Sequence, residues 1–322
     1  MGRYIVRRVA GALLILVLMS FVTFMLINVV PGNTLLAQLA ETGANVGVDA
    51  EVLALFEREL GLDRPVFERY ADWILHVLQG DLVVSFRSGG TQTVVDRIGP
   101  RLPISIELVV LASLISFAVA VPIGVLSAVR QRGPSDYAAR MVAILGLAIP
   151  NFFLATVLVI IFSRWFDINL ASLDKPDLWD DPIQNLQGVI VPVLVLGFGL
   201  SGALMRMARS STLEVLHEDY VRTARAKGLG ERVGITRHVL RNILIPIVTI
   251  FGTQVAFLLG GTVIVEFIFG LHGIGDLFYQ SVRNHDYPVV MGTALLLGFV
   301  VVTMNLLVDL SYAVIDPRIR YT

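Results

Sequence analysis

Six long runs of apolar residues alternate with shorter polar segments along the chain. A transmembrane helix needs about 20 consecutive, mostly apolar residues. The runs approach or exceed that length, and each contains at most one charged residue. They span residues 9–30, 102–129, 138–162, 189–204, 245–269 and 289–315. The pattern predicts an all-α polytopic membrane protein with six transmembrane helices.

Composition and charge narrow the class further. Hydrophobic residues make up 55% of the chain and charged residues 16%, whereas a soluble domain usually carries about 25% charged residues. The net charge of −1 gives no indication of a nucleic-acid partner. Because the chain has no Cys, it has no disulfide, thiolate nucleophile or Cys-ligated metal.

The basic residues are divided unevenly between the two sides that six spans define. If both termini are cytoplasmic, the tails and the loops after the second and fourth spans hold 16 of the 25 Lys and Arg residues. Basic residues concentrate in cytoplasmic loops, so we predict that both termini are cytoplasmic. The near-neutral total is then a cancellation between a positive inner face and a negative outer face.

The boundaries of the spans divide the chain into four parts. Residues 1–30 are the cytoplasmic N-terminus and the first span. Residues 31–101 are an acidic, mostly helical extracytoplasmic segment, with one helix expected from Asp49 to Gly61 and a second from about residue 63 to Leu78. Residues 102–315 form the membrane core, which contains a cytoplasmic loop at 209–246, and residues 316–322 form a cytoplasmic tail. Within the core we expect Pro150 to kink or begin a helix. Glycines such as Gly202 and Gly260 allow close helix approach or, less simply, act as a gating hinge.

The cytoplasmic loop at 209–246 has an amphipathic pattern. Apolar residues recur at spacings of three and four, which predicts a helix within 213–228, ended by the glycines at 228 and 230. A basic amphipathic helix fits two roles: it lies on anionic lipid, or it docks into a groove of a cytoplasmic partner. The apolar stripe consists of Leu213, Leu216, Tyr220, Val221 and Ala224.

An ordered set of short motifs covers nearly the whole chain. The longest lies in this loop and consists of Glu218, Asp219, Tyr220, Val221, Arg222, Thr223, Ala224, Arg225, Ala226, Lys227, Gly228 and Leu229. Further motifs stand at residues 30–32, 60–65, 80–86, 101–108, 237–246, 286–290, 305–309 and 316–318. The loop resembles the "EAA" loop of ABC-importer permeases, and the set resembles the permeases of dipeptide, oligopeptide and nickel importers. Asp219 stands where the broader superfamily often has Ala, but Glu-Asp-Tyr is the usual form in the peptide branch.

The resemblance implies a type I ABC importer permease fold in the inner membrane of a prokaryote. The loop residues just given, apart from Val221, would form the ATPase-coupling loop. The implied partners are a second homologous permease, two cytoplasmic ABC ATPases, an extracytoplasmic substrate-binding protein and membrane lipid, with no nucleic acid. Function would be import of di- or oligopeptides by alternating access.

The chain itself has no enzymatic signature. No G-x-x-x-x-G-K-[ST] motif exists: around Lys227, Val221 and Ala226 stand where the two glycines are needed. ATP and Mg would therefore bind to the partner ATPases, with no cofactor in this chain. The five His residues are scattered without ligand spacing, so we predict no metal site.

Two alternatives from other classes stay open on the residues alone. An ion-gradient-driven secondary transporter would need paired ionisable residues at mid-membrane and usually internal repeats, and neither is visible. A non-transporting membrane scaffold would use the cytoplasmic loop only to recruit a partner.

Three carboxylates fall within the apolar runs. Ionisable residues at membrane depth are costly and are functional candidates by default. Glu266, near the outer end of its span, is a candidate for the translocation path or an outer gate. Glu107 and Asp309 are expected to be structural partners of Arg or polar groups at the membrane interfaces.

Overall fold

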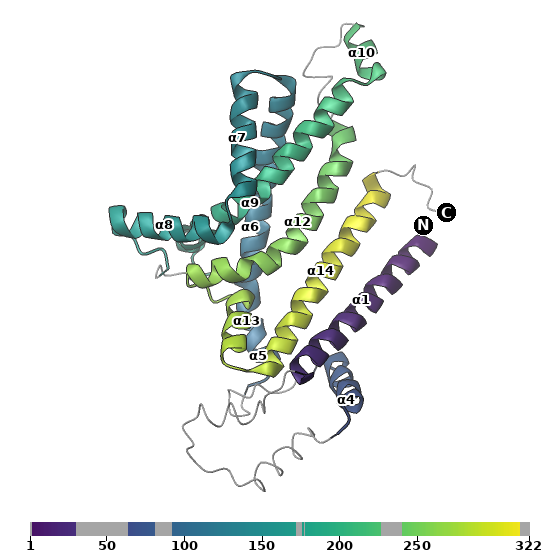
Figure 1. Cartoon of the computed structure of the whole chain (residues 1–322), viewed down its shortest axis with the longest axis vertical. Coiled ribbons are helices and arrows are strands. Elements are labelled where there is room, and N and C mark those ends of the chain that lie inside the picture. The colour runs from purple at the N-terminus through teal and green to yellow at the C-terminus, as the bar shows by residue number, and fades with distance from the viewer. Residues whose placement is uncertain are drawn as a thin grey trace.

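The computed structural model describes residues 2–29, 64–80, 92–171, 176, 178–226 and 240–315. These residues form helices joined by turns and contain no strand, which confirms the predicted all-α class (Figure 1). The helices are α1 (Gly2–Val29), α4 (Val66–Leu78), α5 (Val94–Ile98), the 3-10 turn η2 (Gly99–Arg101), α6 (Leu102–Val129), α7 (Pro134–Ala148), α8 (Asn151–Phe166), α9 (Pro182–Leu216), α10 (Asp219–Ala226), α12 (Leu240–Ile268), α13 (Ile274–Arg283) and α14 (Tyr287–Ile315).

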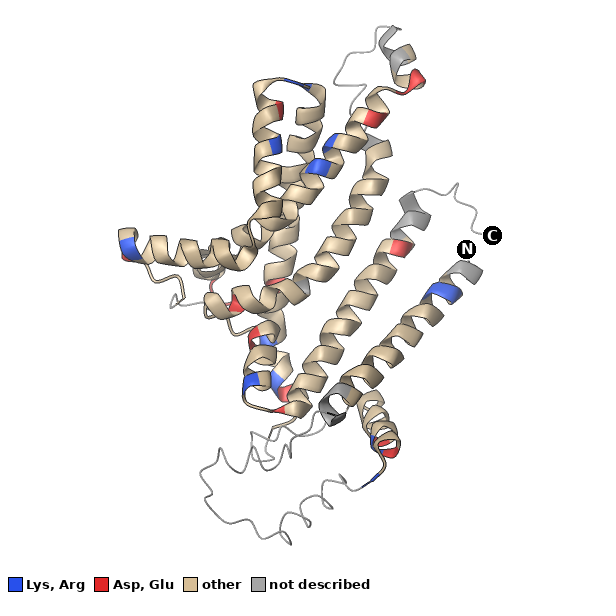
Figure 2. Cartoon of the chain, in the orientation of Figure 1, with Lys and Arg blue, Asp and Glu red and all other residues tan. Residues whose placement is uncertain are grey.

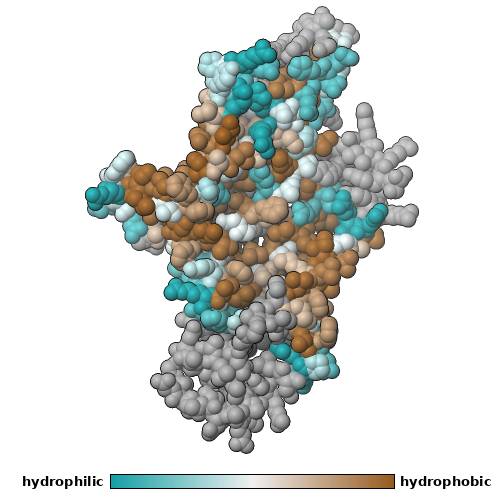
Figure 3. All heavy atoms as spheres, in the orientation of Figure 1, coloured by the Kyte–Doolittle hydropathy of each residue, from teal (hydrophilic) through white to brown (hydrophobic). Residues whose placement is uncertain are grey.

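The long helices agree with the predicted spans. Four segments are long and apolar enough to cross a bilayer, and two bent pairs raise the number to six if each pair is one span. One pair is α7 with α8, and the other is formed by the two halves of α12. Charged residues lie mostly toward the ends of the helices and leave long uncharged stretches between them (Figure 2). On the visible surface, hydrophobic residues form a broad middle zone between more polar ends (Figure 3).

The third predicted span is divided into two separate helices, with a change of direction much larger than a kink. Its two helices, α7 and α8, meet at 99°. Ile149 is extended at ψ 117° and Pro150 is the N-cap of α8. Because proline disfavours the helical conformation in the preceding residue, the chain turns here and α8 runs outward from the bundle (Figure 1).

The fourth span is longer than the apolar run that predicts it. It corresponds to α9, which has 35 residues and is therefore about 52 Å long at 1.5 Å per residue. Asp181 caps its start by accepting hydrogen bonds from the Ile183 and Gln184 amides. The predicted helix within 213–228 is wrong as a single element, because α9 ends at Leu216 and α10 begins at Asp219.

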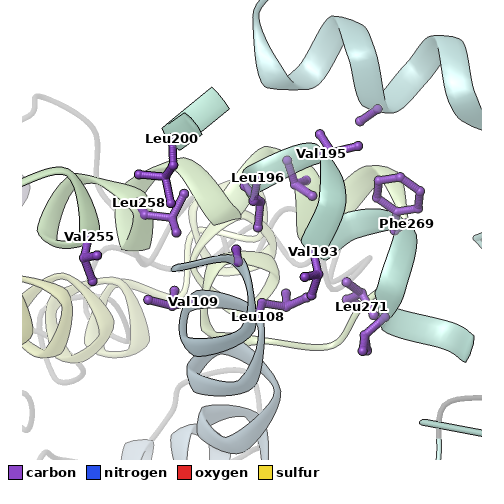
Figure 4. Packing of buried hydrophobic residues seen from close by; sticks show 14 of the residues in the cluster. Leu108, Val109, Val193, Val195, Leu196, Leu200, Val255, Leu258, Phe269 and Leu271 are labelled. Atoms are coloured by element: carbon purple, nitrogen blue, oxygen red, sulfur yellow. The ribbon is translucent and has the colours of Figure 1, made fainter. Parts of the chain in front are cut away.

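The core surrounds α9, against which α6, α7 and α12 pack. Small residues allow this close approach: a Cβ built on Gly202 would lie 2.7 Å from the Ala143 carbonyl oxygen of α7, and one on Gly197 would lie 3.2 Å from the Ala112 oxygen of α6. This confirms the predicted packing role of both glycines. The buried apolar cluster joins α6, α9 and α12 (Figure 4) and includes Leu108, Val109, Val193, Leu196, Leu200, Val255 and Leu258.

The two adjacent glycines in α12 differ from the glycines of α9 in their packing. A Cβ on Gly260 or Gly261 would meet no atom within 4 Å, so neither packs closely within the described chain. The two parts of α12, Asn242–Leu258 and Gly260–Ile268, are bent by 51°. The two glycines therefore lie where α12 bends, and glycine-containing pairs are among the causes of sharp helix bends.

Gly202→Ala is expected to destabilise the bundle. The added methyl would overlap the α7 backbone, and overpacking of this kind costs about 1–3 kcal/mol. The measurement is the thermal unfolding midpoint of the purified chain in detergent. Gly11→Ala is the matched control, since nothing lies within 4 Å of its Cβ position. Equal midpoints for the two variants would contradict the α7–α9 packing described above.

The first helix lies beside the last. Arg8 of α1 forms an ion pair with Asp309 of α14 at 3.0 Å, which confirms the predicted pairing of Asp309 with Arg. Near the other end of α1, Tyr70 of α4 hydrogen-bonds Ser20 at 2.8 Å. The N-terminal part of α1 and the C-terminal part of α14 therefore lie side by side, as Figure 1 also shows. Glu107 likewise has the predicted polar partner, because the Asn185 amide donates to it at 3.3 Å.

Candidate functional site

The helix α10 lies at one end of the molecule, beyond the end of α9 (Figure 1). The turn between them is tight, since the His217 and Glu218 amides bond to carbonyls three residues back. Thr223 donates its hydroxyl to the Asp219 carbonyl at 2.8 Å. Val221 is only 4% exposed, so this α10 side chain packs into the rest of the protein.

Tyr220 connects α10 to the start of the next span. Its hydroxyl accepts a hydrogen bond from the Asn242 side chain of α12 at 2.6 Å, while the residue as a whole is 42% exposed. The helix α10 is therefore attached to α9 through the tight turn and to α12 through this hydrogen bond.

The predicted coupling residues divide by where the structure places them. Glu218 lies in the turn, Asp219, Tyr220 and Thr223 lie in α10, and all four are exposed. The backbone of α10 also includes Arg222, Ala224, Arg225 and Ala226. Lys227, Gly228 and Leu229 lie outside the described residues.

A buried carboxylate near the same end was not among the predicted site residues. Asp136, in the first turn of α7, is 0% exposed. It accepts hydrogen bonds from Arg209 of α9, through Nε at 2.8 Å and Nη2 at 3.2 Å. Ser127 of α6 donates to it at 2.7 Å and the Arg132 amide at 2.9 Å. The sequence does contain a signal for this position: an acidic residue in the first turn of a helix, two residues after Pro134, which starts that helix.

Near the C-terminal end of α12, Glu266 is fully buried and hydrogen-bonded. The Ser105 hydroxyl of α6 donates to one carboxylate oxygen at 2.7 Å, and the Asp276 amide donates to the other at 3.0 Å. The Ile274 amide in turn donates to the Ser105 hydroxyl at 2.8 Å. The carboxylate thus lies at the N-terminus of α13, where the helix dipole favours a negative charge. The prediction that Glu266 lies on the translocation path or at a gate stays a prediction.

Glycines make room for this carboxylate, and ion pairs flank it. A Cβ on Gly273 would lie 2.5 Å from the nearer Glu266 oxygen. Arg101 pairs with Asp276 at 3.5 Å, and Arg97 pairs with Asp286, which is 1% exposed. These pairs fasten the α5–α6 segment to α13 and to the start of α14.

Among the residues that the structure describes, no group of three or more His, Asp or Glu side chains is arranged to hold a metal ion. In both clusters, hydrogen bonds or ion pairs join residues of different helices.

Comparison with known proteins places the chain in a family. The model of the "Binding-protein-dependent transport system inner membrane component" matches residues 120–321, and its N-terminal companion matches residues 1–109. The dipeptide transport system permease protein of Bacillus subtilis is 35% identical over 320 residues, covering 99% of this chain and 98% of its own. The Escherichia coli protein of the same description is 35% identical over 343 residues, covering 100% and 99%. A Brucella abortus protein named as a candidate peptide transport system permease is 37% identical over the full length of both chains.

Membership settles the class of protein. The helices fit the type I importer permease fold expected from the sequence, and the family is the membrane component of systems in which separate subunits hydrolyse ATP. Membership of this family excludes the two alternatives, an ion-gradient-driven transporter and a non-transporting scaffold. The chain is a multi-pass membrane protein and belongs to the binding-protein-dependent transport system inner membrane components, the permease subunits of ABC importers.

Proposed function

We propose that this permease imports di- or oligopeptides, and that with a homologous permease it forms a path that opens alternately to the two sides of the membrane. The assignment of a peptide cargo rests on the 35% identity, over nearly complete chains, with two proteins named as dipeptide permeases. Alternating access requires that ATP binding favour one of the two states by a differential free energy.

The proposed complex has four further members. Two cytoplasmic ATPases dock on α10 and its counterpart in the second permease, and they bind the ATP and Mg. An extracytoplasmic binding protein delivers the peptide. Lipid covers exposed apolar side chains on α1 and α8, such as Leu14 and Ile160, which are 60% and 59% exposed.

The proposed location is the inner membrane of a prokaryote, with both termini cytoplasmic. The ion pair between Arg8 and Asp309 supports the termini sharing a side, and the basic residues of the loops support that side being cytoplasmic. The division into residues 1–30, 31–101, 102–315 and 316–322, with the coupling loop at 209–246, is part of the same proposal.

Uptake of labelled solutes by cells tests whether the cargo is a peptide. In cells that lack this chain, uptake of a labelled dipeptide should fall to background and return when the chain is supplied in trans. Labelled nickel and glutathione form the comparison, since both fit the broader group of permeases. Unchanged peptide uptake together with loss of nickel or glutathione uptake would overturn the peptide assignment.

Tyr220→Phe is expected to slow transport without stopping it. The change removes the hydroxyl that joins α10 to Asn242, and a hydrogen bond of this kind contributes about 0.5–1.5 kcal/mol, which corresponds to roughly 2- to 10-fold. The measurement is peptide transport per ATP hydrolysed in proteoliposomes. Tyr137→Phe, on the exposed surface of α7, is the matched control. If Asn242→Ala and the double variant give losses that simply add, the two side chains do not act together.

A further inference from the structure

Asp136 joins three helices through one buried carboxylate. The end of α6 provides the Ser127 hydroxyl, the turn after it provides the Arg132 amide, and α9 provides two nitrogens of Arg209. Arg140, one turn along α7, adds a second cation at 3.4 Å. The contact between Asp136 and Arg209 is a fork, which fixes the orientation as well as the distance of the two groups.

Packing alone does not account for this ion pair. Burying a carboxylate is costly, and replacing a buried pair by apolar residues of similar volume is often neutral or stabilising. The contact between α7 and α9 already has small residues, including Gly146 and Gly202, that bring the two backbones together. Packing already holds the two helices together. What the ion pair adds is a fixed relative position of α7 and α9.

The position of Arg209 connects the pair to the coupling site. Arg209 lies seven residues before the end of α9, and the stretch from 209 to 216 contains no glycine or proline. A displacement received by α10 therefore enters a continuous helix, in which Leu216 and Val215 pack against the buried core before the ion pair of Arg209 with Asp136 is reached. Beyond Asp136, α7 leads to the 99° corner and α8, whose first residue Asn151 lies against Gly199 of α9.

We propose that Asp136 and Arg209 are positioning residues that make α7 follow α9 when the ATPases move α10. Breaking the pair lets α9 move without α7, so ATP is hydrolysed with less transport. This inference rests on the proposed function, because it presumes that α10 receives motion from the ATPases.

The test measures transport and hydrolysis together in proteoliposomes that contain the whole complex and peptide-loaded binding protein. For Asp136→Asn and Arg209→Lys, we expect ATP hydrolysis within about twofold of the wild type and transport per ATP lower by about fivefold or more, the lower end of typical coupling between sites. Arg206→Lys, one turn earlier on α9 with an exposed side chain, should leave the ratio unchanged. A double variant should be no worse than the poorer single variant.

A second readout distinguishes a positioning role from a merely structural one. Because the chain has no Cys, spin labels can be placed at Met141 of α7 and Glu214 of α9, both exposed. In the wild type the distance between the labels should be the same with and without ATP. In Arg209→Lys it should change only when ATP is added.

Two results would overturn the inference. One is a normal transport-to-hydrolysis ratio in both conservative variants, and the other is a label distance that differs from the wild type equally with and without ATP. If Asp136→Asn does not assemble, Arg209→Lys alone decides. Failure of the proposed function is separable, because then the wild-type complex itself would not transport peptide.

Discussion

Charge reversal at Arg225, or a bulky residue at Gly228, is expected to stop peptide transport while the chain still inserts and assembles. Arg225 belongs to the last turn of α10, and Gly228 follows two residues later in the sequence. At the centre of a protein interface, a single substitution often costs 2 kcal/mol or more, which is about 30-fold in affinity. A docking helix that is held less tightly no longer follows its partner, so hydrolysis and transport separate.

The measurement for these variants is transport beside ATP hydrolysis in the same proteoliposomes. We expect Arg225→Glu and Gly228→Trp to lose at least tenfold in transport per ATP. Arg225→Lys, which keeps the charge, and Gly228→Ala, which adds one methyl, are the matched controls and should retain most of the activity. Variants that assemble with the ATPases and transport at the normal rate would show that α10 and the residues after it do not couple the two processes.

Glu266→Ala is expected to have the largest effect on stability. Removing the carboxylate leaves the Ser105 hydroxyl and the Asp276 amide without their acceptor in a site that is closed to solvent. Each buried donor left unsatisfied costs about 1–3 kcal/mol, so the free energy of unfolding should fall by about 2–6 kcal/mol. Glu266→Gln should be intermediate, because its NH2 group faces one of the two donors in place of an acceptor.

Thermal unfolding in detergent measures this loss, and transport assays show whether a gate is involved. Glu68→Ala, on the exposed surface of α4, is the control and should leave the unfolding midpoint nearly unchanged. If Glu266 also controls an outer gate, Glu266→Gln should raise ATP hydrolysis in the absence of binding protein. An unfolding midpoint equal to that of the wild type in Glu266→Ala would contradict the buried network.

The sequence was informative wherever a feature depended on local pattern. Apolar length alone predicted the spans, because a bilayer imposes that length on any helix that crosses it. The partners of Asp309 and Glu107 followed from the cost of an unpaired carboxylate at the membrane interface, and Arg8 and Asn185 meet that need.

Features that depend on distant residues were not predictable in the same way. The contacts of Glu266 join Ser105 to residues about 160 positions away, and nothing in either local sequence specifies the other. Local sequence does not single out Asp136, because its partner Arg209 is one of many basic residues in and beside the predicted cytoplasmic loop. The division between α9 and α10 was missed because the apolar spacing continues across the turn at His217.

This chain is the permease of an ATP-driven peptide importer, and we propose that the ATPases act through α10. The most direct measurement is ATP hydrolysis by the purified complex in proteoliposomes, with and without peptide-loaded binding protein. We predict that loaded binding protein stimulates hydrolysis, that peptide accumulates inside only when ATP is present, and that Arg225→Glu abolishes accumulation. Accumulation driven by an ion gradient without ATP, or a purified complex that lacks ATPase subunits, would contradict the claim.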